Sequence, residues 1–177
     1  MKPIKWRPGS LPKGVTLAQP DALIATGFGV GLAPFASGTW GSLAALPFGW
    51  LIDRAAGAPG LLIAAAIATL AGLWASDRLV QRADVQDPGY IVIDEIAAQF
   101  LALAFAPANW WGYAIAFVAF RAADIVKPFP ADWCDRNVHG GLGVMLDDLV
   151  AGIYAGIATW AACRWLPIAE AIRAAGL

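Results

Sequence analysis

Long stretches without a charged side chain dominate the sequence. Four runs contain no Asp, Glu, Lys, Arg or His, and they cover residues 22–52, 55–76, 96–120 and 149–163. A helix that crosses a bilayer needs roughly 20 predominantly apolar residues, with some tolerance. Each run is long enough, or nearly long enough, to contain such a helix. The pattern therefore predicts membrane helices joined by polar connections.

Two of these runs contain residues that interrupt helices. The first run begins with several glycines and Pro34, so its helical part is expected to begin near Trp40. The third run contains the turn signal Ala106-Pro107-Ala108-Asn109, which predicts a helical hairpin. We therefore expect five crossing or re-entrant segments, near residues 40–53, 60–77, 91–106, 110–126 and 148–166.

Charged residues are divided unevenly between the two sides that these segments would create. Residues 1–39, 78–90 and 127–147, with the adjoining segment ends, carry nine of the twelve Lys and Arg residues. The positive-inside rule assigns this side to the cytoplasm. Eleven of the thirteen Asp and Glu residues fall on the same side. The sequence therefore predicts an active site on the cytoplasmic face.

The composition agrees with a membrane protein. Of 177 residues, 59% are hydrophobic and only 14% are charged, and the mean hydropathy is +0.62. Soluble domains typically have about 25% charged residues. The expected fold class is all-α, a polytopic membrane helical bundle that forms one domain over residues 1–177, with 1–20 as an N-terminal tail. A compact soluble all-α bundle with helices that are hydrophobic on every side is the alternative.

Two partner classes are disfavoured by the charge and cysteine content. The formal net charge is −1, which is untypical of a nucleic-acid-binding protein. The two cysteines, Cys134 and Cys163, are too few for a disulfide scaffold. The oligomeric state stays open, because Gly152 and Gly156 form a small-residue pair that could pack against a helix of this chain or of another.

Two acidic pairs are candidate metal ligands. Asp94 and Glu95 have apolar residues on both sides, and ionisable groups placed so deep in a hydrophobic segment are functional candidates. Asp147 and Asp148 directly precede the last hydrophobic segment. Carboxylate oxygens are the ligands that Mg²⁺ prefers. The alternative role for the second pair is to cap the helix through its dipole.

A third group of charged residues lies at the end of the segment 110–126. Arg121, Asp124 and Lys127 are spaced so that the first two share a helix face and Lys127 lies near it. A hairpin turn near Pro107 would place Glu95 beside Arg121. An ion pair that only neutralises two charges at the membrane edge is the alternative.

Further polar groups occur in two glycine-rich segments. His139, the only histidine, is flanked by glycines and carboxylates and could act as a general acid, although a single histidine is more often structural. The segment around Thr39 leads into a helix and could offer backbone N–H groups to a phosphate, or be only an entry turn. Basic groups, carboxylates and a membrane location together indicate phosphate chemistry on a lipid.

Four motifs, in order between about residues 20 and 160, closely resemble the phosphatidylglycerophosphatase A family. They are Thr26-Gly-Phe-Gly-Val-Gly-Leu-Ala-Pro with Gly38-Thr-Trp-Gly-Ser-Leu-Ala-Ala, Ile91-Val-Ile-Asp-Glu, Phe120-Arg-Ala-Ala-Asp-Ile-Val-Lys-Pro-Phe-Pro, and Asp135-Arg-Asn-Val-His-Gly-Gly-Leu-Gly-Val-Met-Leu-Asp-Asp-Leu-Val-Ala-Gly. The resemblance implies Mg²⁺-dependent hydrolysis of phosphatidylglycerophosphate to phosphatidylglycerol and phosphate. It also implies a place in glycerophospholipid biosynthesis, in the bacterial inner membrane.

The leading hypothesis gives each candidate residue a role. The metal ligands would be Asp94, Glu95, Asp147 and Asp148. The substrate phosphate would be bound by Arg121, Lys127 and Thr39. The catalytic residues would be Asp94, Glu95, Asp124 and His139, with His139 protonating the leaving oxygen.

Two other functions stay open at this point. One is a metal-dependent phosphatase that acts on another lipid phosphate, such as phosphatidic acid or an isoprenoid phosphate. The other is a small membrane transporter, because charges within helices and broken helices also occur in transporters. Most charged residues lie on one side of the predicted segments, which favours an enzyme over a transporter.

Overall fold

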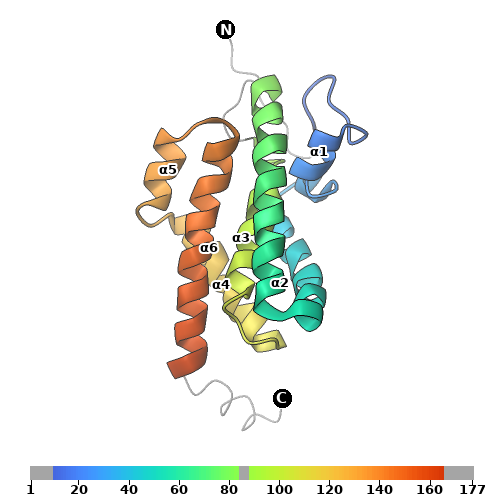
Figure 1. Cartoon of the computed structure of the whole chain (residues 1–177). Helices are drawn as coiled ribbons and strands as arrows, with labels where there is room; N and C mark the ends of the chain where they lie inside the picture. Colours follow the sequence, from blue (N-terminus) through green and yellow to red (C-terminus); the bar gives the residue numbers. More distant parts are fainter. Residues whose placement is uncertain (1–9, 84–87, 166–177) are drawn as a thin grey trace.

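All regular structure in the described part of the chain is helical. The computed structural model describes residues 10–83 and 88–165. These ranges contain α1 (Pro20–Ala25), a short 3-10 helix η1 (Val30–Leu32), α2 (Ser37–Ala83), α3 (Ile93–Leu103), α4 (Trp110–Val126), α5 (Ala131–Asn137) and α6 (Gly140–Trp165). The expected all-α class is therefore confirmed for these residues (Figure 1).

The long helix α2 is a hairpin of two helical arms. Gly57 has φ 63° and ψ −162°, a conformation that glycine adopts far more readily than residues with a Cβ. Pro59 follows and lacks the N–H that a continuous helix would use. Figure 1 shows the chain reversing at this point, so that the two arms lie side by side. The arms include the predicted segments 40–53 and 60–77.

The predicted helical hairpin is present. α3 ends at Leu103 and α4 begins at Trp110, with the turn around Pro107 between them. Oδ1 of Asn109 accepts a hydrogen bond from the backbone N–H of Gly112, with an N···O distance of 2.8 Å. This bond satisfies one of the free donors at the start of α4. α4 covers the predicted range 110–126.

The last helix begins earlier than expected. α6 starts at Gly140 instead of residue 148, so the glycine-rich stretch that the sequence indicated as a loop is helical. A carboxylate oxygen of Asp77 on α2 accepts the backbone N–H of Gly141 at 3.2 Å. This contact satisfies one of the donors that the first turn of a helix leaves free.

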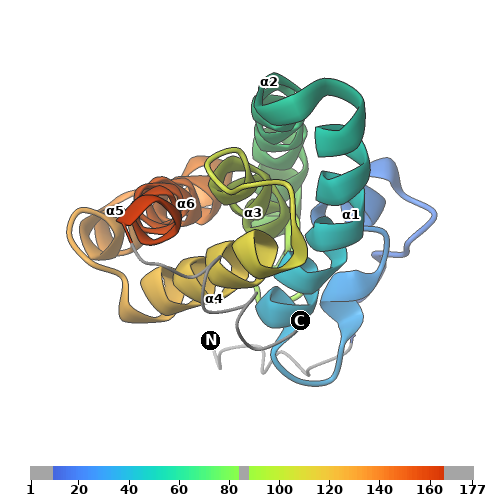
Figure 2. The same ribbon diagram turned by 90° about the horizontal axis from the view of Figure 1, so that it is seen from below.

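α3 lies at the centre of the bundle. It packs against α2, α4 and α6, which surround it in the view along the helices (Figure 2). Ala97, Ala98, Ala102 and Leu103 on this helix are fully buried. The acidic pair Asp94–Glu95 occupies the first turn of α3, so it lies inside the bundle at one end.

The small-residue pair of α6 packs within the chain. A Cβ added at Gly152 would lie 2.8 Å from the carbonyl oxygen of Ala98 on α3. A Cβ at Gly156 would lie 2.7 Å from the ring of Phe105. Both glycines therefore bring α6 close to the α3 hairpin. Contact with a second copy of the chain is not needed to explain them.

Two described helices, Ser37–Arg82 and Gly140–Trp165, are long and apolar enough to cross a membrane. Many large apolar side chains on them are exposed, including Ile63, Ile67 and Leu70 on the second arm of α2. Soluble monomers rarely expose large contiguous apolar surfaces. The exposed surface therefore agrees better with the predicted membrane bundle than with the soluble alternative.

Some predictions concern residues outside the described ranges. These residues are 1–9 of the predicted tail, 84–87 of the predicted connection at 78–90, and all residues after 165. The division of basic residues between two sides includes Lys2, Lys5, Arg7 and Arg173 from these parts. That division therefore stays a prediction.

Replacing Gly152 by alanine is expected to destabilise the protein. The added Cβ would contact backbone of α3, which cannot move without shifting the helix. Overpacking costs about 1–3 kcal/mol, which exceeds the gain of about 1 kcal/mol that alanine has over glycine in a helix. Thermal unfolding in detergent should show a lower Tm. Ile157→Ala, at an exposed position of α6, should change the Tm much less; equal stability of both variants would contradict the close packing.

Candidate active site

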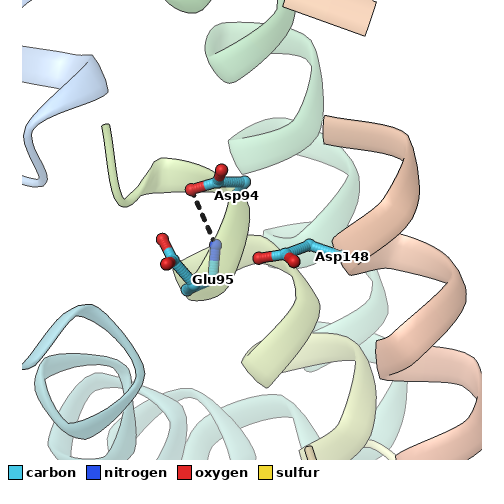
Figure 3. A group of neighbouring side chains, drawn as sticks. All are labelled: Asp94, Glu95 and Asp148. Carbon is cyan, nitrogen blue, oxygen red and sulfur yellow. Dashed lines mark hydrogen bonds between the residues drawn. The ribbon is translucent and has the colours of Figure 1, made fainter. Parts of the chain in front are cut away.

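Carboxylates from two helices converge at one end of the bundle. Asp94 and Glu95 come from the first turn of α3, and Asp148 comes from α6. One oxygen from each lies within 4.8 Å of those of the other two. Figure 3 shows the three side chains facing a common space. Oδ1 of Asp94 also accepts the backbone N–H of Glu95 at 3.0 Å (Figure 3), which fixes the first turn of α3.

α4 adds a fourth carboxylate and one guanidinium group. Nη1 of Arg121 lies 2.9 Å from Oδ2 of Asp124 and 3.4 Å from the hydroxyl oxygen of Ser42 on α2. Asp124 also interacts electrostatically with Asp148. We define the acidic cluster as Asp94, Glu95, Asp124 and Asp148. Arg121 lies at its edge.

The acidic cluster has the properties of a cation site. Like charges in a low-dielectric interior are costly unless they are compensated. Arg121 forms an ion pair with one member of the cluster, Asp124. Oε2 of Glu95 and Oδ2 of Asp148 are buried without a hydrogen-bond partner in the described chain. Carboxylate oxygens with free lone pairs fit a hard divalent cation, so Asp94, Glu95 and Asp148 form a candidate metal-binding cluster.

A cavity of about 420 Å³ lies beside the acidic cluster. Glu95 and Arg121 form part of its wall. The segment 33–39, which leads into α2, forms another part, together with Gly89 and Ile125. The predicted hairpin therefore does bring Glu95 and Arg121 to one place.

Gly38 allows α2 to approach these two side chains closely. A Cβ at this position would lie 2.0 Å from Oε1 of Glu95 and 3.2 Å from Nη1 of Arg121. The hydroxyl of Ser37 donates to the carbonyl oxygen of Gly89, which holds the start of α2 in place. The free backbone N–H groups of a first helical turn favour anions. The start of α2 therefore lines the cavity with groups that favour an anion.

Not all predicted site residues lie together. Thr39 lines the same cavity as Glu95 and Arg121. Lys127 instead pairs with Oδ1 of Asp135 and Oδ2 of Asp147, each at 2.6 Å. His139 is exposed between α5 and α6 and is not among the residues that line the cavity.

Lys127 holds the connection between α4 and α5 against α6. It ends α4 with φ 47°, a left-handed conformation that is costly for a residue with a Cβ. Burial lowers the pKa of Lys127, but its hydrogen bonds and ion pairs with Asp135 and Asp147 outweigh burial and raise the pKa above its ordinary value. Lys127 therefore stays protonated at physiological pH and keeps its ion pairs with both carboxylates.

Sequence reasoning missed the contacts of two residues in the site. Ser42 contacts Arg121, and Gly38 contacts both Glu95 and Arg121. The two residues are four positions apart on α2, so they lie on the same helix face. This spacing was a usable signal, but only the packing of α2 against α4 identifies what the face contacts.

Comparison with known proteins now identifies the family. The family model described as Phosphatidylglycerophosphatase A matches residues 23–163. The chain belongs to the phosphatidylglycerophosphatase A family. The family match includes every residue of the acidic cluster as well as Arg121, Gly38 and Thr39.

Individual relatives agree over most of their length. A phosphatidylglycerophosphatase A of Escherichia coli (strain K12) is 40% identical over 153 residues, which cover 84% of this chain and 87% of that protein. A phosphatidylglycerophosphatase A of Haemophilus influenzae is 39% identical over 155 residues, covering 87% and 95%. A Bacteroides thetaiotaomicron protein, named provisionally as a phosphatidylinositol-3-phosphatase, is 40% identical over 157 residues, covering 81% and 93%. No solved structure matches the chain.

Replacing Gly38 by alanine should damage the site more than the fold. The new Cβ would displace the flexible end of Glu95 from its place beside Arg121. We expect phosphate release to fall at least about tenfold, equivalent to about 1.4 kcal/mol in the barrier, with little change in Tm. Gly41→Ala is the matched control, because its Cβ would meet Val92 at 2.8 Å and should mainly lower the Tm. Normal activity in Gly38→Ala would show that the position of Glu95 is not required.

Proposed function

We propose that this protein hydrolyses the terminal phosphate ester of phosphatidylglycerophosphate, giving phosphatidylglycerol and inorganic phosphate in glycerophospholipid biosynthesis. The observation that best supports this proposal is the convergence of Asp94, Glu95 and Asp148 beside a cavity that also contains Arg121. The family and the names of two relatives specify the substrate. The same findings argue against the transporter alternative.

We propose Mg²⁺ as the cofactor, held by Asp94, Glu95 and Asp148. Mg²⁺ typically binds through one or two carboxylates, several waters and substrate phosphate. When bound, it would lower the pKa of a water molecule and stabilise negative charge on the phosphate oxygens. Asp147 remains a predicted fourth ligand. Its Oδ1 is buried without a partner in the described chain, while its Oδ2 is paired with Lys127.

Arg121 is the proposed phosphate-binding residue. Nε of Arg121 is buried and has no partner among the described residues, so it can donate to a phosphate oxygen. Asp124 holds Nη1 at 2.9 Å and thereby orients the guanidinium plane. A planar guanidinium can donate two parallel hydrogen bonds to a phosphate. Thr39 and the backbone N–H groups at the start of α2 would add further donors.

Two residues with predicted roles, His139 and Lys127, do not line the cavity. Attack of a water oxygen on phosphorus breaks the bond to the glycerol oxygen, which must then take a proton. His139 stays the predicted donor of this proton, although it does not line the cavity. The phosphate contact of Lys127 likewise stays a prediction, since its ammonium group is paired with Asp135 and Asp147.

We further propose that both arms of α2, together with α3, α4 and α6, cross or re-enter the bacterial inner membrane. At a rise of 1.5 Å per residue, the 11 residues of α3 span about 16 Å, about half of the roughly 30 Å hydrocarbon core. A re-entrant α3 hairpin would explain this length. The starts of α2, α3 and α6 and the end of α4 carry the site, which we place on the cytoplasmic face.

A second candidate is the same chemistry on another lipid phosphate. The relative named provisionally as a phosphatidylinositol-3-phosphatase supports this alternative. Phosphatidic acid and an isoprenoid phosphate belong to the same class. Phosphate release from a panel of these lipids by the purified protein separates the substrates.

Asp148→Asn tests the metal site. The substitution keeps the shape of the side chain but removes its charge, so the protein should fold. Wild-type protein should release phosphate only with Mg²⁺, and its unfolding free energy should rise by about 2.7 kcal/mol at Mg²⁺ concentrations 100-fold above Kd. Asp148→Asn should lose both effects. Asp132→Asn, which alters only a surface pair with Arg136, should keep both. Mg²⁺-dependent activity in Asp148→Asn would exclude Asp148 as a required metal ligand. A helix-capping role is excluded for it already, because α6 starts eight residues earlier, at Gly140.

Arg121→Lys tests the phosphate contact. Lysine keeps the positive charge but loses the planar pair of donors. We expect a folded protein with phosphate release reduced about 100-fold, or about 2.7 kcal/mol in the barrier. A variant with Glu95→Gln and Arg121→Met should also fold, because it removes one charge of each sign from the site, and should be inactive. Normal turnover in this double variant would exclude both assigned roles.

A further inference from the structure

The guanidinium group of Arg121 is held at one of its three nitrogens. Oδ2 of Asp124 lies 2.9 Å from Nη1. Oγ of Ser42 on α2 accepts a hydrogen bond from the same nitrogen, with an N···O distance of 3.4 Å. Nη1 carries two hydrogens, so these two acceptors can use both. Neither Nε nor Nη2 has a hydrogen-bond or ion-pair partner among the described residues.

The two nitrogens without a partner form one edge of the guanidinium plane. The N–H of Nε and one N–H of Nη2 point in parallel, an arrangement that matches two oxygens of a phosphate. The chain therefore holds Arg121 at the nitrogen that this edge does not use. Arg121 also lines the cavity in which the phosphate is proposed to bind.

Ser42 restrains Nη1 from a neighbouring helix. Its side chain is fully buried. Oγ donates to the carbonyl oxygen of Gly38 at 2.9 Å, so the single hydroxyl hydrogen is used and a lone pair faces Arg121. Asp124 is on the same helix as Arg121, three residues later, whereas Ser42 is on α2. Contacts from two helices limit the rotation of the guanidinium plane that either contact alone would allow.

We propose that Ser42 is a positioning residue for phosphate binding, which holds Nη1 of Arg121 so that the edge formed by Nε and Nη2 is free for the phosphate. The inference rests on the proposed function, because it takes a phosphate as the ligand of Arg121. Since Ser42 also binds the carbonyl oxygen of Gly38, it links Arg121 to the first turn of α2. One hydroxyl group thus connects the two elements that are proposed to bind the phosphate.

Two substitutions of Ser42 separate positioning from packing. Ser42→Ala removes the acceptor but suits a helix, so the Tm should change little. Its kcat/KM for phosphatidylglycerophosphate should fall about tenfold and the inhibition constant of inorganic phosphate should rise about tenfold, as expected for one lost hydrogen bond to a charged group. Ser42→Thr keeps a hydroxyl that can bond the carbonyl four residues earlier. It should keep the wild-type inhibition constant, although the extra methyl group should lower the Tm.

A double-mutant cycle tests whether Ser42 acts through Arg121. Adding Ser42→Ala to Arg121→Lys should leave the inhibition constant of Arg121→Lys unchanged, because lysine has no guanidinium edge to orient. Thr69→Ala is the matched control. Oγ1 of Thr69 makes the same type of bond, to the carbonyl oxygen of Ala65 at 2.8 Å in the second arm of α2, and Thr69 does not line the cavity. This variant should keep the wild-type kcat/KM and inhibition constant.

The phosphate inhibition constant decides the outcome. An unchanged value in Ser42→Ala would overturn the inference, and so would an equal further rise in the Arg121→Lys background. An equal rise in Ser42→Thr would also overturn it, because the effect would then follow packing and not the hydroxyl group. A wild-type protein that releases no phosphate from the lipid would instead overturn the proposed function.

Discussion

The convergence of four carboxylates at one end of an apolar bundle is the constraint on which the rest of the structure depends. Asp94, Glu95, Asp124 and Asp148 come from three helices, two of them are buried, and Arg121 forms an ion pair with Asp124. Such a group of like charges is unfavourable in a low-dielectric interior without a counter-charge. A divalent cation would offset most of the remaining negative charge. The acidic groups that require compensation therefore lie at the place where the ligands are proposed to bind.

Close helix packing makes this arrangement possible. α3 carries two of the carboxylates and is surrounded by α2, α4 and α6. Glycines at contact points, such as Gly38 and Gly152, remove the side chains that would otherwise separate the helices. In a closely packed interior, a small change in the volume of one side chain shifts the neighbouring helices. The same glycines that shorten the distance between helices therefore also fix the distance between the charged groups.

A second group of charged residues, separate from the acidic cluster, contains Lys127. Lys127 pairs with Asp135 and Asp147 and joins the end of α4 to α6. This places Lys127 outside the ion pairs of the acidic cluster, so Arg121 is the basic residue that faces the cavity. One basic group thus stabilises the connection between helices, and the other is available to a ligand.

The sequence by itself determined the long apolar helices, the hairpin at Pro107 and the family, but not the short helices α1, η1 and α5. Uncharged runs, the turn at Pro107 and the motif around Asp94 depend on local chemistry, which a sequence displays directly. The tertiary structure decided which neighbours each side chain has. Asp147 and Asp148 are adjacent in sequence and were expected to act together, but successive residues on a helix point about 100° apart. Asp147 therefore pairs with Lys127 while Asp148 joins Asp94 and Glu95. The early start of α6 at Gly140 and the contact of Gly38 with Glu95 also depend on packing between segments that are distant in sequence, and no local pattern encodes such contacts.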